Sequence, residues 1–417
     1  MSDRRVVLTG LGSVNPLANS VPEFWSALIA CQSGIRRITK FDVSEHASQI
    51  GGEVQNWDNA KPESADVRDW RHMDPFAQYA FVSAIEAVAD SGLDFETEDR
   101  QRCGVVVGTG IGGLMELEEQ HSRMLTKGPR RVSPFTVPKL MANAASGNIA
   151  LRWGLQGVNF CVVTACASAA HSMGESFRII QRDEADIMLS GGSEAALTPI
   201  GLASFCALKG LSTRNDDPAA ASRPWDRGRD GFLLAEGAGV VVLEELTHAT
   251  HRGAEIYAEL IGYGSSCDGY HITAPDPDGN GAILAVRRCL AEAGVSTDDV
   301  DYINAHGTST PLGDLAETRG IKKVFGDYAH NGLMISSTKS ATGHMLGASG
   351  GVELIASALT IQNGVVPATL NLEDPDDECD LDYVPNTPRE KQVDIILSNS
   401  FGFGGHNACL LLKRFTG

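Results

Sequence analysis

One pattern occurs in both halves of the chain and limits what it can fold into: a run of β-branched residues, a turn of small residues, and a helical stretch. In the first half, residues 158–163 form the apolar run and residues 164–168 the turn. In the second half, residues 300–304 and 334–337 each lead into a similar turn. The first turn holds a cysteine and the other two each hold a histidine. Strands that alternate with helices in this way predict an α/β fold.

The length of 417 residues suits two domains of about 200 residues, or one duplicated body. We expect residues 1–253 to form an N-terminal half with the cysteine, and residues 254–417 a C-terminal half with the two histidines. No Pro/Ser-rich linker separates them, so they are expected to pack together with the site at their junction. The recurring pattern hints at internal duplication, although the residue identity between the halves is weak.

The glycine content is unusually high, since 45 of 417 residues are glycine and the usual level is roughly 7%. This content indicates tight turns and backbone close to a ligand. A strand over residues 5–9 is expected to end in a turn at residues 10–12. A helix from Asp74 to Ser91 has Asp74 as its cap and stops at Gly92.

Charge and cysteine content exclude several classes of function. The chain has 34 basic and 53 acidic residues, a net charge of −19, so neither nucleic acid nor an anionic membrane is an expected partner. Its nine cysteines are scattered without a C-x-x-C pair, which favours reduced thiols over disulfides or a zinc site. The apolar run at the N-terminus is too short for a signal peptide, and no stretch approaches the roughly 18 apolar residues of a membrane span. We therefore expect a cytoplasmic protein.

Cys166 is the candidate nucleophile. It follows an apolar strand and begins a helix, and the positive end of a helix dipole favours thiolate over thiol. A buried cysteine is more often a small core residue, but the position of Cys166 favours a nucleophile. Cys161, inside the expected strand, and Cys409, in the last one, are interpreted as core residues.

A cysteine nucleophile needs a proton handler and an oxyanion binder. His306 and His344 lie in comparable Gly/Thr-flanked turns and are the candidate proton handlers. Lys339 lies in an apolar turn and requires a carboxylate, for which Asp314 and Glu317 are candidates. Both acids also fit the alternative of ordinary helix-start residues that complement the dipole.

The segment Asn399-Ser-Phe-Gly-Phe-Gly-Gly-His-Asn407 forms a glycine loop after a strand. Such a loop can be a plain turn, but it can also bring a backbone N–H against a ligand carbonyl. Phe401 or Phe403 could then cover an apolar tunnel.

Together these motifs resemble the thiolase-like condensing enzymes, and most closely the β-ketoacyl-acyl carrier protein synthase II (ketosynthase) family. The resemblance covers essentially the whole chain. It rests on Thr164–Ser168, Leu211–Asp216, Ser222–Asp226, His306–Pro311, Ser337–His344 and Asn399–Gly405.

The resemblance implies a homodimer of duplicated α/β halves in a five-layered α-β-α-β-α fold. It also implies a decarboxylative condensation, in which a cysteine-bound acyl chain from acyl carrier protein is extended by two carbons from malonyl carrier protein. No cofactor is required, and a structural Na⁺ or K⁺ is an option. The backbone N–H groups of Cys166 and Phe403 would bind the oxyanion, and Phe403 would also be the gate.

Roles for further residues follow from the same resemblance. Catalysis would involve Cys166, His306, His344, Lys339 and Phe403, with Asp314 and Glu317 anchoring the lysine and histidine geometry. Five residues would line the acyl tunnel or bind the pantetheine arm: Ile111, Phe205, Phe401, Thr308 and Thr310. The carrier protein would dock on Arg68, Arg71, His72, Arg130, Arg131 and Lys209, which otherwise are ordinary solvated charges. Cation ligands would be Asn304, Glu353 and Asn399.

Other interpretations fit the residues less well. A degradative thiolase would need a second cysteine where this chain has Gly404-Gly-His-Asn407, and the synthase III and chalcone-synthase branch pairs one His with one Asn. A chain-length factor would lack Cys166. A ketosynthase of a polyketide or specialised acyl pathway stays open, as does a non-catalytic acyl-binding scaffold. His406 departs from the family, in which many members have threonine.

Overall fold

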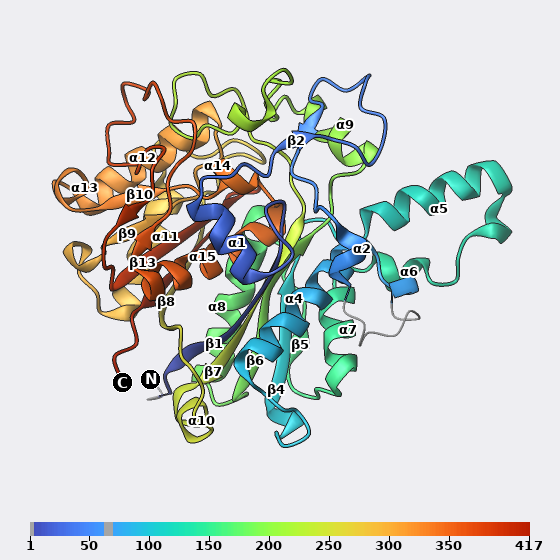
Figure 1. Ribbon diagram of the computed structural model, residues 1–417, viewed down its shortest axis with the longest axis horizontal. Helices are drawn as coiled ribbons and strands as arrows, with labels where there is room; N and C mark the ends of the chain where they lie inside the picture. The colour runs from blue at the N-terminus through green and yellow to red at the C-terminus, as the bar shows by residue number, and fades with distance from the viewer. Residues whose placement is uncertain (1–3, 62–69) are drawn as a thin grey trace.

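The computed structural model describes residues 4–61 and 70–417. Its core is a continuous ten-stranded sheet in the order β10-β9-β13-β14-β8-β1-β7-β6-β4-β5 (Figure 1). The strands are β1 (Val6–Val14), β4 (Cys103–Gly108), β5 (Asn159–Phe160), β6 (Ile187–Glu194), β7 (Gly237–Glu245), β8 (Ala258–Cys267), β9 (Tyr302–Asn304), β10 (Met334–Ser336), β13 (Ile395–Gly402) and β14 (His406–Lys413).

The two halves of this sheet have the same topology. Numbered in chain order, the five strands of each half lie in the order 3-2-4-5-1. In both halves the first three strands of that order are parallel and the last two are antiparallel to their neighbours. The halves join where β1 pairs with β8. This repetition supports the internal duplication that the sequence hints at, while the boundary between residues 253 and 254 stays a prediction.

Two helices fill the space between the halves and complete a five-layered arrangement (Figure 1). Helices α8 (Ser168–Gln181) and α15 (Ser349–Asn363) each pack on strands of both halves. Residues 349–361 of α15 are all buried, as expected for a helix that is covered on every side. The outer layers are α4 (Pro75–Ser91) and α7 (Ala144–Trp153) on one side, and α11 (Asn280–Ala293) and α12 (Pro311–Phe325) on the other.

The first strand is longer than the sequence indicates. Gly10 and Gly12 were expected in a turn, but β1 continues through them to Val14. Their role is close packing, because a Cβ on Gly10 would lie 2.1 Å from the Ala87 carbonyl oxygen of α4. The glycines therefore let α4 lie directly on the sheet.

The strand before the cysteine is shorter than expected. Only Asn159 and Phe160 form β5, both are exposed, and β5 is the edge of the sheet. Cys161 lies beyond its end and is half-buried, so the interpretation of Cys161 as a core strand residue is wrong. Cys409 is fully buried in β14, as predicted.

The expected helix over residues 74–91 is confirmed. The Asp74 side chain accepts a hydrogen bond from the Phe76 amide, and Gly92 ends the helix in a left-handed conformation with φ of 67°. The remaining elements are α1 (Val21–Ile29), β2 (Arg36–Arg37), β3 (Ile50–Gly51), α2 (Trp57–Ala60), η1 (Arg100–Arg102), α5 (Leu114–Lys127), η2 (Pro129–Arg131), α6 (Thr136–Leu140), η3 (Ala165–Ala167), α9 (Pro199–Ala207), η4 (Pro218–Ala220), α10 (Leu246–His251), η5 (Thr297–Asp299), α13 (Tyr328–Asn331), α14 (Lys339–Thr342), η6 (Leu346–Ala348), β11 (Val365–Val366) and β12 (Arg389–Glu390).

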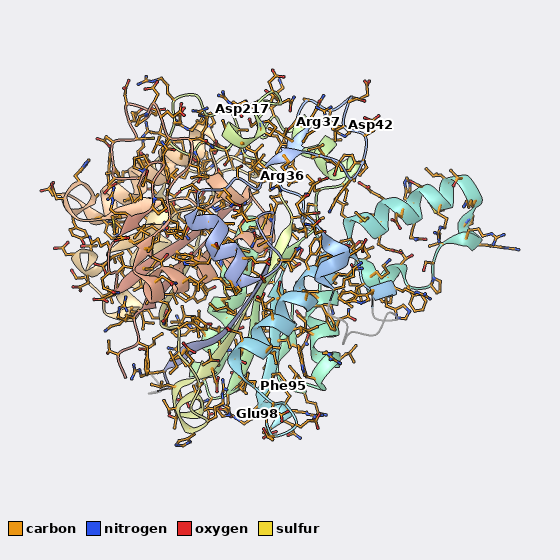
Figure 2. All side chains as sticks on the ribbon, in the orientation of Figure 1. Arg36, Arg37, Asp42, Phe95, Glu98 and Asp217 are labelled. Atoms are coloured by element: carbon orange, nitrogen blue, oxygen red, sulfur yellow. The ribbon has the colours of Figure 1, made fainter. Side chains whose placement is uncertain are left out.

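The turn that carries Lys339 and His344 includes α14 and lies toward one end of the molecule (Figure 1). Arg36 and Arg37 mark this end, whereas Phe95 and Glu98 mark the opposite end (Figure 2). The segment before β2 is tied to α14 by a hydrogen bond from the Gly34 amide to the Ala341 carbonyl, 2.8 Å long. Among the described residues, no helix is both long and apolar enough to cross a membrane.

Candidate active site

Cys166 lies in the short helix η3, directly before α8. Ala165 adopts a left-handed conformation with φ of 49°, which is uncommon for a residue with a side chain. The Ser168 hydroxyl stabilises this turn, because it accepts a hydrogen bond from the Thr164 amide at 2.9 Å. The Cys166 side chain is 7% exposed and packs in an apolar cluster that includes Leu202 and Phe232.

Burial decides the protonation state of this thiol. It raises the pKa of Cys166 to about 12, although the positive charge of Lys339 and hydrogen bonds from the Phe403 and Cys166 amides act in the opposite direction. The expectation that the helix terminus favours the thiolate is therefore not met. Removal from water destabilises the charged thiolate by more than the helix dipole stabilises it.

The glycine loop between β13 and β14 touches the turn that carries Cys166. A Cβ on Gly402 would lie 2.8 Å from the Thr164 carbonyl oxygen and 3.1 Å from the Cys166 amide nitrogen. Only glycine permits this approach, which brings the Phe403 amide within hydrogen-bonding reach of the Cys166 sulfur. Two backbone donors thus converge at the nucleophile, which is the arrangement of an oxyanion hole.

His306 and His344 form a second group beside the cysteine. Their ring centroids are 5.4 Å apart with an interplanar angle of 85°. Burial and the charge of Lys339 lower both pKa values well below the usual value of 6.5. Both imidazoles are therefore neutral at physiological pH, and a neutral imidazole can donate one hydrogen bond without carrying a charge.

Lys339 has a different partner from the one that the sequence suggested. Its ammonium group, 1% exposed, forms an ion pair with Glu353 of α15 and not with Asp314 or Glu317. The reason is that both acids are occupied by backbone amides. Glu317 accepts hydrogen bonds from the amides of His306 at 2.9 Å and Gly307 at 2.8 Å.

Asp314 supports the turn that follows His306. Its carboxylate accepts the amides of Ser309 at 3.1 Å and Trp225 at 2.9 Å, and it lies 3.6 Å from the Arg229 guanidinium. Asp314 and Glu317 thus fix the backbone of the histidine turn directly. Their proposed role as anchors of Lys339 is corrected.

One cavity of about 440 Å³ collects most of the expected catalytic and substrate-binding residues. Its lining includes Cys166, His306, His344, Thr308, Thr310, Glu317, Lys209, Phe401 and Phe403. Ile111 and Phe205 are not part of this lining. Ile111 is 42% exposed, and Phe205 packs edge-on against Phe232 with ring centroids 5.6 Å apart. The residues expected to carry the thioester chemistry and those expected to bind the pantetheine arm thus line one cavity. The assignment of Ile111 and Phe205 to the acyl tunnel stays a prediction.

The expected docking residues are exposed but only partly described. Arg71, Arg130 and Arg131 are exposed, whereas Arg68 lies outside the described residues. His72 stacks on Phe135 with ring centroids 4.3 Å apart, which ties the segment with Arg71 to the one after η2. Lys209 is exposed and also lines the cavity. Their role in docking stays a prediction.

Four buried side-chain oxygens on β9, β13 and α15 lack a hydrogen-bond partner among the described residues. They are Asn304 Oδ1, Glu353 Oε2, Asn399 Oδ1 and Ser400 Oγ. Their side chains come from adjoining elements, since the Asn304 amide donates to the Glu353 carbonyl at 3.3 Å and β9 pairs with β13. Buried oxygens without donors fit a hard cation, and Ser400 was not expected among them.

Three further residues were not identified from the sequence. Glu194 is fully buried at the end of β6 and accepts hydrogen bonds from Gly110, Ile111 and Gly347, so it joins the loops of both halves around Cys166. Its position at the end of a strand, two residues after a Gly-Gly pair, is a signal that could have found it.

His171 and Ser349 are the other two. His171 Nδ1 lies 2.8 Å from the Thr164 hydroxyl, and burial lowers the pKa of His171 to about 4. The Ser349 hydroxyl forms a hydrogen bond with the His344 ring. No local sequence pattern predicts this contact. His406, the departure from the family, begins β14 opposite Gly402.

Fold and site together define a thiolase-like enzyme, with a candidate cysteine nucleophile, two neutral histidines and paired backbone donors in one cavity. The N-terminal and C-terminal domain models of beta-ketoacyl synthase match residues 3–249 and 257–373. The chain therefore belongs to the beta-ketoacyl synthase family, and it is a condensing enzyme of the acyltransferase class.

Several known proteins resemble this chain over its full length. It is 50% identical to 3-oxoacyl-[acyl-carrier-protein] synthase 2 of Coxiella burnetii, covering 99% of both chains, and 48% identical to the protein of that name from Synechocystis, covering 100% and 99%. Among solved structures, a ketosynthase in complex with its type II PKS acyl-carrier protein superimposes with a TM-score of 0.91 at 34% identity, covering 99% and 100%. A beta-ketoacyl synthase from Burkholderia phymatum gives 0.92 at 33%, with the same coverage.

Proposed function

We propose that the protein is a 3-oxoacyl-acyl carrier protein synthase of type II, which elongates fatty acyl chains by decarboxylative condensation with malonyl carrier protein. The proposal rests on one observation: Cys166, two neutral histidines and two backbone donors lie together in one cavity. The identity of 47–50% over full length to relatives with this name supports the same substrates.

The first half-reaction transfers the acyl group. The Cys166 sulfur attacks the acyl thioester, the bond to the carrier sulfur breaks, and the proton of the Cys166 thiol passes to the departing carrier thiolate. The amides of Cys166 and Phe403 stabilise the negative oxygen of the tetrahedral intermediate. Lys339 contributes positive potential, which lowers the cost of forming the thiolate.

The second half-reaction forms the carbon–carbon bond. His306 and His344 donate hydrogen bonds to the malonyl thioester oxygen while carbon dioxide leaves, and the resulting enolate carbon attacks the acyl carbonyl on Cys166. The carbon–sulfur bond to Cys166 then breaks, and the departing Cys166 thiolate takes up a proton from solvent. Neutral imidazoles suit this step, because they stabilise the developing charge without protonating the carbanion.

Acyl carrier protein is the proposed partner. Lys209 at the cavity and the exposed Arg71, Arg130 and Arg131 offer local positive charge on a chain of net charge −19. Local charge of this kind steers an acidic partner even when the net charge is unfavourable. Thr308 and Thr310, whose hydroxyls lie 3.0 Å apart at the cavity wall, would bind the pantetheine arm.

A second copy of the chain is the other proposed partner. The edge strand β5 is exposed on both residues, and large apolar side chains are exposed around it and on the neighbouring α5, α6 and α7. Exposed strand edges and groups of exposed large apolar side chains are uncommon on monomers. The patch comprises Leu117, Leu125, Phe135, Val137, Met141, Leu151, Phe160 and Val163.

A monovalent cation, Na⁺ or K⁺, is proposed at the unpaired oxygens of Asn304, Glu353, Asn399 and Ser400. The cation would bind the carboxylate oxygen of Glu353 that Lys339 leaves free. It would also hold β9 and β13 in register behind the site. No other cofactor is proposed. All nine cysteines are free thiols, which supports a reducing compartment such as the cytoplasm.

The ketosynthase of a polyketide pathway is the competing function, since one matched solved structure contains a type II PKS ketosynthase and another is the ishigamide ketosynthase/chain length factor. Their identities of 34% and 35% are well below those of the fatty-acid relatives. The test incubates the protein with malonyl carrier protein and acyl chains on carrier proteins of each pathway, and identifies products by mass spectrometry. We expect a 3-oxoacyl product two carbons longer on the fatty-acid carrier, and activity confined to the polyketide carrier would reject the proposal.

A further inference from the structure

The ring of His344 is held by a hydroxyl from the neighbouring helix. Ser349, the first residue of α15, places its Oγ 2.9 Å from His344 Nδ1, and both side chains are buried. The backbone of His344 is fixed as well, since its amide donates to the Leu233 carbonyl at 2.8 Å and its carbonyl accepts from the Ala235 amide at 3.0 Å. Nδ1 is thus turned toward the helix, and Nε2 is the nitrogen left for the cavity.

Two aromatic rings also pack against His344, and the charged Lys339 lies close enough to lower the pKa of His344. Phe232 packs against the His344 ring with ring centroids 5.4 Å apart, and His306 does so at the same distance. Among the described residues, His344 Nδ1 is the one hydrogen-bond partner of the Ser349 hydroxyl. The hydroxyl proton consequently has a single acceptor available.

This geometry determines where a neutral His344 carries its proton. If Ser349 donates to Nδ1, the ring proton must be on Nε2, where it can be donated into the cavity. In the opposite tautomer, Nδ1–H would donate to the serine oxygen. The serine proton would then be buried without an acceptor, and Nε2 would be a bare acceptor facing the substrate. An unsatisfied buried donor is the costlier of the two states.

We propose that Ser349 is a positioning residue that keeps the proton of His344 on Nε2, and so gives this histidine its role as hydrogen-bond donor to the malonyl thioester oxygen. The inference rests on the proposed function for its consequence in catalysis, but its statement about the proton is independent of any substrate. Ser349 acts through His344 and does not touch the reacting atoms.

The test combines kinetics with a direct measurement of the proton. Ser349→Ala, Ser349→Thr and wild type are compared for acyl transfer to Cys166 and for carbon dioxide release from malonyl carrier protein. We expect S349A to slow decarboxylation about tenfold with an unchanged KM and acyl transfer, and S349T, which retains the hydroxyl, to recover most of the rate. Ser176→Ala is the matched control, because it removes a buried hydroxyl pair with Ser190, 2.9 Å long, away from the cavity.

The proton is located by nitrogen NMR of the full protein labelled with ¹⁵N-histidine, with His344→Ala to assign the signal. We expect Nδ1 of His344 to be unprotonated in wild type and partly protonated in S349A. A protonated Nδ1 in wild type, or decarboxylation in S349A at the wild-type rate, would overturn the inference. Absence of decarboxylation in wild type would instead reject the proposed function, and the NMR result would still decide the role of Ser349.

Discussion

Replacement of Gly402 by alanine tests the contact on which the oxyanion site depends. The added methyl would lie 2.8 Å from the Thr164 carbonyl oxygen, against a normal contact of 3.4 Å or more, and also 3.1 Å and 3.2 Å from the Cys166 and Ala167 amides. Since all three neighbours are backbone atoms, the two loops must separate by about 0.6 Å, the difference between the first two distances. The separation withdraws the Phe403 amide from the cysteine sulfur and from the oxygen of the intermediate.

The loss of one oxyanion donor typically costs about 100- to 1000-fold in rate, and we expect G402A to lie near the lower figure. The assay is the time course of Cys166 acylation by acyl carrier protein, followed by intact mass. Gly147→Ala is the control, because the same methyl in α7 would meet nothing within 4 Å. Acylation of G402A within about threefold of wild type, with the fold intact, would refute the assignment of this loop to the oxyanion.

Three further expectations concern the thiol, the docking surface and the cation. Because burial raises the pKa of Cys166 to about 12, the rate of its alkylation by iodoacetamide should rise about tenfold per pH unit between about pH 7 and 9. An inflection near pH 8.5 would indicate an ordinary thiol. Reversal of Arg130 and Arg131 to glutamate should raise the KM for carrier protein in a salt-dependent manner, while Arg287→Glu on α11 should not. An unchanged KM would place docking elsewhere. Replacing K⁺ or Na⁺ by choline should lower the melting temperature by a few degrees in wild type but not in Asn304→Leu, which has lost a ligand. Equal melting temperatures of wild type in all three salts would argue against a bound cation.

The sequence predicts those parts of the site that depend on local chemistry. Cys166, His306 and His344 each follow a strand in a turn of small residues, and such turns place side chains at the carboxyl ends of strands, where α/β sites form. The structure brings all three to one cavity.

What the sequence misses depends on contacts across the fold. Lys339 forms its ion pair with Glu353 of α15. The sequence does not predict this pair, because α15 is buried only when both halves of the fold pack around it. Ser349 reaches His344 across the short helix η6, which no periodicity reveals. The thiolate expectation for Cys166 also fails for this reason, since a helix dipole is visible in the sequence whereas the depth of burial is not.

Edge strands present the same difficulty. Residues 158–163 are predicted as a buried strand, yet β5 is a two-residue edge strand with its side chains exposed. An apolar run that covers a surface looks the same in sequence as one that fills a core.

The most direct test of the central claim is the intact mass of the protein after incubation with a medium-chain acyl carrier protein, for wild type and Cys166→Ala side by side. The account predicts a gain of one acyl group in wild type and no gain in C166A. An acylated C166A, or a wild type that gains no mass, would contradict the assignment of Cys166 as the acyl acceptor.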